Sequence, residues 1–70
     1  MNQTKQFSLN GEIYVINHEI TLLDLIKYFD YNDSLLVLEY NNTICNKKKW
    51  KTIVIENNDT IEIVTIVGGG

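Results

Sequence analysis

The sequence predicts an α+β fold, in which a mixed sheet of four to five strands is covered on one face by one main helix. Three observations lead to this prediction. Strand-like segments, rich in β-branched residues or alternating in polarity, occur near the start, the middle and the end of the chain. Only residues 22–29 combine apolar residues at helical spacing with a capping signal. The chain has 70 residues and no linker, which limits it to one small domain.

A β-hairpin is predicted at the start of the chain. Phe7 and Leu9 alternate with polar residues and indicate a short, half-buried strand. Asn10-Gly11 follows, and this pair favours a type I′ turn because both central residues of that turn need positive φ. Residues 12–17 are rich in β-branched and aromatic types and form the returning strand.

The helix is expected to begin after Thr21. The Thr21 hydroxyl can accept a hydrogen bond from a free amide of the first turn, and Asp24 completes a variant of the capping box. Four apolar residues then recur at i, i+3, i+4 and i+7 and share the face that packs on the sheet: Leu22, Leu25, Ile26 and Phe29.

The next segment is predicted to contain two strands joined by a turn. Residues 35–40 form a nearly continuous apolar run whose length suits a buried central strand. Asn41-Asn42 is a turn signal, and residues 43–44 are a short strand beyond it.

The last part of the chain returns to the sheet. Residues 45–51 are polar and indicate a loop with one helical turn, anchored by Trp50. Residues 53–55 add a short extended piece, and residues 57–59 are a turn. Residues 60–67 are the clearest strand of the chain and lead directly into three glycines.

This order of elements is the outline of a β-grasp, or ubiquitin-like, fold. We expect residues 1–67 to form the β-grasp domain and residues 68–70 to form a flexible C-terminal glycine tail. The sheet face beneath the helix is predicted to carry eight residues: Phe7, Leu9, Ile13, Val15, Leu36, Leu38, Ile61 and Ile63.

The opposite face of the sheet is predicted to bear an apolar patch. Since side chains alternate along a strand, Val64 and Ile66 point away from the helix if Ile61 and Ile63 point toward it. We expect Val64, Ile66 and Tyr14 to be exposed there, and such a patch usually marks a surface that binds a partner.

Composition argues against several classes of function. Six Lys+Arg against nine Asp+Glu give a net charge of −3, which is unfavourable for binding nucleic acid. His18 and Cys45 carry no local signature of nucleophilic catalysis, and no spacing of ligands is typical of a metal site. No apolar run reaches the roughly 20 residues that span a bilayer. We therefore expect a soluble protein that is not an enzyme, holds no metal and binds neither nucleic acid nor membrane.

The run Lys47-Lys48-Lys49, followed by Trp50 and Lys51, has two interpretations. Basic and aromatic residues together can contact nucleic acid. The alternative is a solvated loop, which we favour because the whole chain is acidic. The absence of Ala, Arg and Pro, together with abundant Ile, Asn and Lys, is typical of an AT-rich genome and lowers the weight of any single lysine.

Gly68-Gly69-Gly70 are the residues that most directly suggest a function. Glycine has no Cβ, so such a tail can lie extended in a narrow tunnel and approach another backbone closely. No side chain shields the carboxylate of Gly70 from attack. A compact body with such a tail is suited to be a substrate of larger enzymes.

On these residues the sequence resembles the ThiS family of sulfur-carrier proteins, from about Phe7 to Gly70. The resemblance includes residues 9–12 of the hairpin, the helix start at residues 21–25, residues 38–42 and Trp50, and it is most specific over residues 58–70. The chain departs from the family in having Asn41-Asn42 in place of Asn-Gly, and in lacking Pro and Arg within residues 45–49.

The resemblance implies a sulfur carrier for the thiazole moiety of thiamine. It implies that an E1-like adenylyltransferase of the ThiF type uses ATP and magnesium to adenylate the carboxylate of Gly70. Sulfur from a cysteine-desulfurase relay then displaces AMP, and the resulting thiocarboxylate donates sulfur to a ThiG-type thiazole synthase. Gly68 and Gly69 would thread the tail into these partners, while Val64 and Ile66 are docking residues inferred from strand alternation. No cofactor is expected on the chain itself.

Three other functions remain open at this stage. A molybdopterin-synthase small subunit uses the same terminal chemistry, but is usually longer and has Pro before its glycines. A ubiquitin-like protein modifier typically has a basic residue before the diglycine, whereas Val67 precedes the glycines here. A β-grasp binding module would make the tail incidental. The expected compartment is the cytoplasm, or the plastid stroma if the gene is plastid-encoded.

Overall fold

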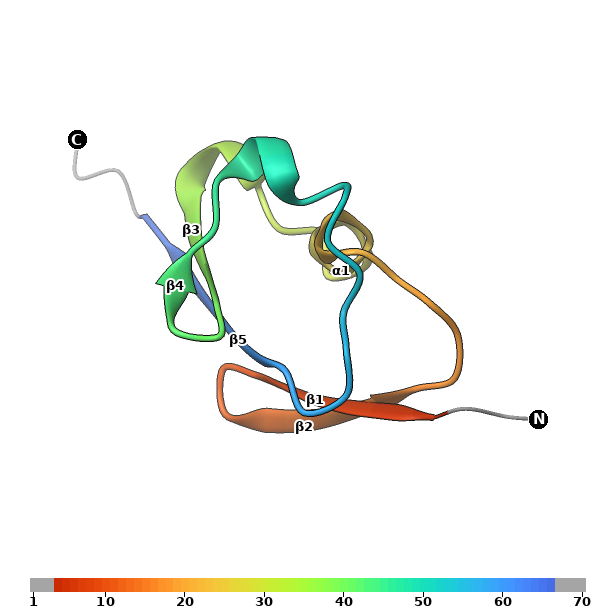
Figure 1. Ribbon diagram of the computed structural model, residues 1–70. Helices are drawn as coiled ribbons and strands as arrows, with labels where there is room; N and C mark the ends of the chain where they lie inside the picture. The colour runs from red at the N-terminus through yellow and green to blue at the C-terminus, as the bar shows by residue number, and fades with distance from the viewer. Residues whose placement is uncertain (1–3, 67–70) are drawn as a thin grey trace.

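The computed structural model describes residues 4–66, which form a five-stranded sheet crossed on one face by a helix (Figure 1). This confirms the predicted α+β, β-grasp fold. The elements are β1 (Lys5–Leu9), β2 (Glu12–Ile16), α1 (Leu22–Tyr28), β3 (Leu36–Tyr40), β4 (Thr43–Ile44) and β5 (Thr60–Thr65), with short 3-10 helices η1 (Asp33–Leu35) and η2 (Lys47–Lys49).

The strand order is β2-β1-β5-β3-β4, which places β5 at the centre of the sheet. β5 runs parallel to β1, where Leu9 lies opposite Ile61, and antiparallel to β3, where Leu38 lies opposite Ile63. The last strand of the chain is therefore held by a neighbour on each side. The predicted central strand, residues 35–40, is instead second from the edge as β3.

Tight turns connect β1 to β2 and β3 to β4, as predicted. Asn10 and Gly11 have φ of 51° and 84°, and Asn41 and Asn42 have φ of 53° and 71°. Positive φ at both central residues is the requirement of a type I′ turn. Asn42 thus adopts the positive φ at a turn position where glycine is the usual residue.

The prediction for β2 was wrong in which of its faces is buried. A two-residue turn pairs Leu9 with Glu12, so Phe7 lies opposite Tyr14, and directly opposed residues share a face of the sheet. Ile13 and Val15 consequently point away from the helix and are 59% and 64% exposed. Tyr14, predicted to be exposed, packs against the core: its ring stacks on Phe7 at 5.8 Å between centroids and meets Phe29 edge-on.

The capping box of α1 is present as predicted. The Asp24 amide donates to Thr21 Oγ1 at 3.1 Å, and the Thr21 amide donates to Asp24 Oδ2 at 2.9 Å. These hydrogen bonds, first of all the one from the Thr21 backbone, lower the pKa of the Asp24 carboxyl. Leu22, Leu25 and Ile26 are buried on the sheet, while Phe29 at the C-cap is half-buried.

The segment between η2 and β5 closes the open side of the core. Trp50 and Ile55 are 2% and 0% exposed. Backbone hydrogen bonds tie the segment to the start of α1, from Leu22 N to Ile53 O and from Ile55 N to Ile20 O. The core consists of these two residues, the helix face and five of the predicted sheet residues, Phe7, Leu9, Leu38, Ile61 and Ile63, with Leu36 partly buried beside them.

No helix within residues 4–66 combines the length and the apolar character needed to cross a membrane. The predicted domain boundary between residues 67 and 68 lies outside the described residues, and so do the tail residues Gly68, Gly69 and Gly70.

Candidate functional site

The end of β5 is the part of the described structure from which the glycine tail continues. Its pairing with β3 extends from Tyr40 opposite Ile61 to Leu36 opposite Thr65. The Ile66 amide then donates to the carbonyl oxygen of Leu35 at 2.6 Å, so backbone hydrogen bonds hold the chain up to the last described residue. In Figure 1 the blue strand β5 runs outward to the upper left corner of the molecule.

A buried carboxylate fixes the start of β5. Asp59 is 8% exposed and accepts three hydrogen bonds: from Tyr40 Oη at 2.5 Å, from Asn41 Nδ2 at 3.0 Å and from the Glu56 amide at 2.7 Å. Asn41 Oδ1 in turn accepts from the Thr60 amide at 2.8 Å. Burial, followed by the bond to Asp59, raises the pKa of the Tyr40 hydroxyl.

The prediction of a turn at residues 57–59 gives no indication of this network. The turn itself is present, with Asn58 at φ 71°. The signal that was available is the position of Asp59 immediately before a strand and after two asparagines. A short acceptor in that position commonly bonds to nearby backbone amides.

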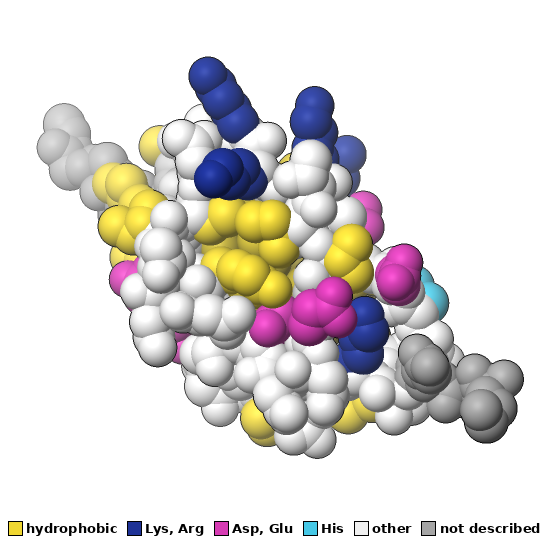
Figure 2. Space-filling view, viewed as in Figure 1, with side chains coloured by type: hydrophobic (Ala, Val, Ile, Leu, Met, Phe, Trp, Pro, Cys, Tyr) yellow, Lys and Arg dark blue, Asp and Glu magenta, His cyan; other side chains and the backbone are white. Residues whose placement is uncertain are grey.

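The outer face of the sheet carries apolar residues next to the end of β5, as predicted. Val64 and Ile66 are 60% and 52% exposed, and Val37 lies opposite Val64 on the neighbouring strand. Hydrophobic side chains are visible at this corner in Figure 2. Val15 belongs to the same outer face but lies on the edge strand β2, which β1 separates from β5.

The structure does not bring Cys45 and His18 together. Cys45 follows β4 and is half-buried, and this burial raises the pKa of its thiol, which disfavours the thiolate. His18 lies in the loop before α1, with Nδ1 3.1 Å from Asn17 Oδ1. The two side chains line separate hollows of the surface. Within residues 4–66, no three His, Cys, Asp or Glu side chains gather in a way that could hold a metal ion.

A β-grasp body whose central strand leads into Gly68-Gly69-Gly70 defines a protein of the ubiquitin-like class. The sequence model of the ThiS family matches residues 4–70. The chain therefore belongs to the ThiS family.

The sequences similar to this chain include one that is named a sulfur carrier protein. A protein called ycf40 from Trieres chinensis is 61% identical over 70 residues, covering 100% of this chain and 96% of that protein. A ycf40 protein from Porphyra purpurea is 31% identical over 70 residues, covering 100% of this chain and 99% of that protein. Sulfur carrier protein ThiS of Bacillus subtilis is 32% identical over 50 residues, covering 71% and 76%.

A solved structure supports the fold independently. The crystal structure of the thiamine biosynthesis protein ThiS from Geobacter metallireducens superimposes with a TM-score of 0.78, covering 93% of this chain and 99% of that one. At 15% identity this likeness is evidence for the β-grasp fold alone.

Proposed function

We propose that this chain carries sulfur on the carboxylate of Gly70 and supplies it to the thiazole moiety of thiamine. The observation that supports this most is the position of β5, which is hydrogen-bonded to β1 and β3 and leads through Ile66 to the three glycines. The family match extends through residue 70. The Bacillus subtilis relative is named a sulfur carrier protein, and the Geobacter protein a thiamine biosynthesis protein.

The chemistry belongs to partner enzymes. A carboxylate is a poor acyl donor, so an E1-like adenylyltransferase of the ThiF type first joins the Gly70 carboxylate to the α-phosphate of ATP with magnesium, and pyrophosphate leaves. A persulfide supplied by a cysteine-desulfurase relay then attacks the acyl carbon, and AMP leaves. A second thiol of the partner reduces the resulting acyl disulfide, which releases the thiocarboxylate and leaves a disulfide on the partner. A ThiG-type thiazole synthase takes the sulfur from the resulting thiocarboxylate.

The role of this chain is to present the carboxylate. Gly68 and Gly69 allow the tail to pass through a narrow opening, because neither adds a Cβ. Hydrogen bonds hold the chain up to Ile66, so the partner meets a body that is fixed as far as that residue. ATP and magnesium are thus used by the partner, and this chain has the part of a carrier rather than of an enzyme.

The test of this function is intact-mass analysis. Purified protein is incubated with its E1-like partner, ATP, magnesium and sulfide, and the expected product is heavier by the exchange of one oxygen for sulfur. Transfer of that sulfur to thiazole synthase would establish the thiamine pathway. Transfer to the large subunit of molybdopterin synthase, or covalent attachment of the chain to other proteins, would replace our proposal. No mass change with an active partner would contradict sulfur carriage itself.

A second prediction concerns docking through Val64 and Ile66. Replacing either by Asp should raise the Kd for the E1-like enzyme about tenfold, because an apolar contact at an interface is lost and a charge is desolvated. The matched control is Val15→Asp, on the same face at the far edge of the sheet, which should leave the Kd unchanged. Calorimetric titration measures all three. Equal weakening by the control, or unfolding of Val64→Asp, would contradict the assignment.

For the compartment, we propose the plastid stroma. Relatives from Trieres chinensis, Porphyra purpurea and Pyropia yezoensis carry the name ycf40, which suggests genes encoded in plastids. A chain translated there needs no transit peptide to reach the stroma. Immunoblots of purified plastids against the remaining cell fractions separate this from a cytoplasmic location.

A further inference from the structure

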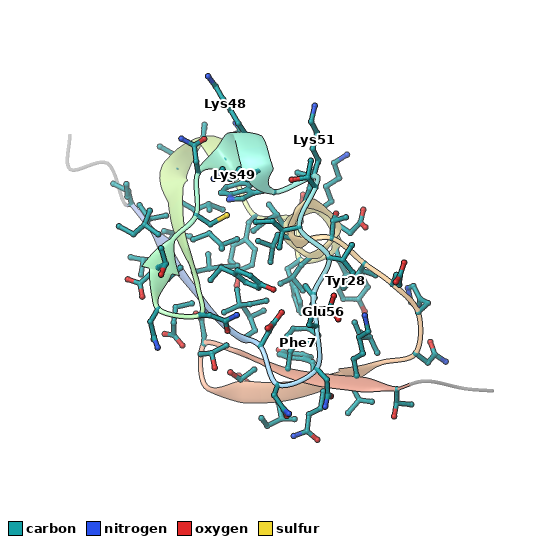
Figure 3. The ribbon with its side chains drawn as sticks, viewed as in Figure 1. Phe7, Tyr28, Lys48, Lys49, Lys51 and Glu56 are labelled. Carbon is teal, nitrogen blue, oxygen red and sulfur yellow. The ribbon has the colours of Figure 1, made fainter. Side chains whose placement is uncertain are left out.

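Five of the six lysines lie at one end of the molecule, and we call this group the lysine pole. It consists of Lys27 at the end of α1, Lys47, Lys48 and Lys49 in η2, and Lys51 just after it. Figure 2 shows the dark blue side chains gathered along the top of the molecule. In Figure 3, Lys48 and Lys51 both point away from the body on that side.

Four of these lysines surround one shallow hollow of about 730 Å³, together with Leu23 and Asp33. Lys47 pairs with Asp33, with 3.3 Å between Nζ and Oδ2. This is the one ion pair that the pole makes within residues 4–66. Lys27, Lys48 and Lys51 line the same hollow without such a pair among the described residues, so their positive charges act on the same region of solvent. The hollow therefore attracts carboxylates or other anions.

The backbone beneath the lysines is fixed to the core. Asn46 caps η2, with its Oδ1 accepting from the Lys48 amide at 2.9 Å. Trp50, at the other end of η2, is buried and donates from Nε1 to the carbonyl oxygen of Cys45 at 3.1 Å. The backbone of residues 46–50 is therefore fixed before binding. A partner that binds through these lysines does not have to order it.

The lysine pole lies beside the end of β5. The Ile66 amide donates to the carbonyl of Leu35, which ends η1, and η1 begins at Asp33, the partner of Lys47. A continuous set of contacts therefore joins the last described residue to the pole. A protein that contacts the end of β5 therefore lies near the Lys47 side of the pole.

We propose that the lysine pole docks on an acidic protein surface, made of Asp and Glu side chains, around the opening through which the activating enzyme receives the tail. This inference rests on the proposed function. Opposite charges at the rim of an interface raise the association rate more than they slow release. That property suits a carrier that must bind and leave more than one enzyme.

A protein surface fits the pole better than a polyanion does. Asp33 lies within the hollow, where it would repel a phosphate but can accept a hydrogen bond from a protein partner. The chain as a whole carries a net charge of −3, so a long nucleic acid or an anionic membrane would also meet acidic surface.

The test measures association with the E1-like enzyme by stopped flow over a range of salt concentrations. Lys48→Glu/Lys51→Glu should lower the association rate about tenfold or more at low salt, and this difference should vanish at high salt. Lys48→Arg/Lys51→Arg keeps both charges and should associate at the wild-type rate. Carbodiimide, which couples amines directly to carboxylates, should link Lys48 or Lys51 to Asp or Glu of the enzyme. Lys5, which pairs with Glu56 away from the pole, should form no link to the enzyme.

The outcomes separate the two proposals. If wild-type protein acquires sulfur but the charge-reversed variant associates at the wild-type rate at every salt concentration, the lysine pole has no docking role and sulfur carriage stands. If wild-type protein acquires no sulfur, the proposed function fails. The cross-links then test docking by the lysine pole, and their absence overturns this second proposal as well. Tighter binding of the pole to a single-stranded RNA oligonucleotide or to phosphatidylglycerol vesicles than to the enzyme would also overturn it.

Discussion

Deleting Gly70 should reduce thiocarboxylate formation at least about 100-fold, although the new chain end is again a glycine carboxylate. The deletion shortens the tail by about 3.5 Å. Adenylation needs the carboxylate oxygen in line with the α-phosphate, and a misplacement of about 1 Å already costs about 100-fold in rate. Because the body is held by hydrogen bonds up to Ile66, it cannot slide forward to compensate without losing pairs in the sheet. Single-turnover assays with the E1-like enzyme, read by intact mass, measure the effect.

The control is Gly70→Ala, which preserves the length of the tail and adds one methyl group. Both variants should unfold at the wild-type temperature, because the buried apolar residues found among residues 4–66 all lie within residues 7–63. A Gly70-deleted protein that acquires sulfur at the wild-type rate would show that the length of the tail is not critical and that the carboxylate of Gly69 serves equally well. A lower unfolding temperature would show that the tail contributes to the fold.

The hairpin shows both what the sequence could predict and where it was insufficient. Asn10-Gly11 predicts a type I′ turn by local backbone preference, and the turn is present. The same turn determines that Tyr14 is opposite Phe7, and this alone places Ile13 and Val15 outside. Composition favoured the opposite choice, because Ile and Val are the more frequent core residues. The register of β1 against β2 decides which residues of β2 are buried. It follows from counting outward from the two-residue turn at Asn10-Gly11.

Other features depend on contacts between distant parts of the chain. Lys27 joins Lys47 and Lys48 only because α1 and η2 pack side by side, and sequence reasoning treated the lysine run as a separate loop. Val64 and Ile66 were assigned to the correct face because strand alternation is local. Asp59 depends on both local and distant residues. The turn that contains it could be predicted locally, but Tyr40 and Asn41, which donate hydrogen bonds to it, belong to the β3–β4 hairpin.

The second large effect is expected for Asp59→Asn, which should destabilise the fold by about 2–3 kcal/mol. Asparagine has nearly the shape of aspartate, but only one of its terminal atoms accepts hydrogen bonds. Tyr40, Asn41 and the Glu56 amide all donate to Asp59, so at least one donor then faces an amide donor in a buried site. In a domain of this size such a loss lowers the unfolding temperature by about 10–20 °C. Thermal and urea unfolding followed by circular dichroism measure it.

Tyr40→Phe is the matched variant, since it removes one donor and leaves the carboxylate two others. It should destabilise the fold by about 1–2 kcal/mol, and the double variant should lose less than the sum of the two single losses because both changes remove the same hydrogen bond.

The pH dependence of stability provides an independent check of the Tyr40–Asp59 bond. The folded protein raises the pKa of Tyr40 above the ordinary value of 10.0, so the unfolded tyrosine ionises first and wild-type stability falls as the pH rises through that value. The fall should be shallower in Tyr40→Phe. Strict additivity and an unchanged alkaline slope would together show that Asp59 and Tyr40 act separately, and that Asp59 holds β5 through the backbone and Asn41 alone.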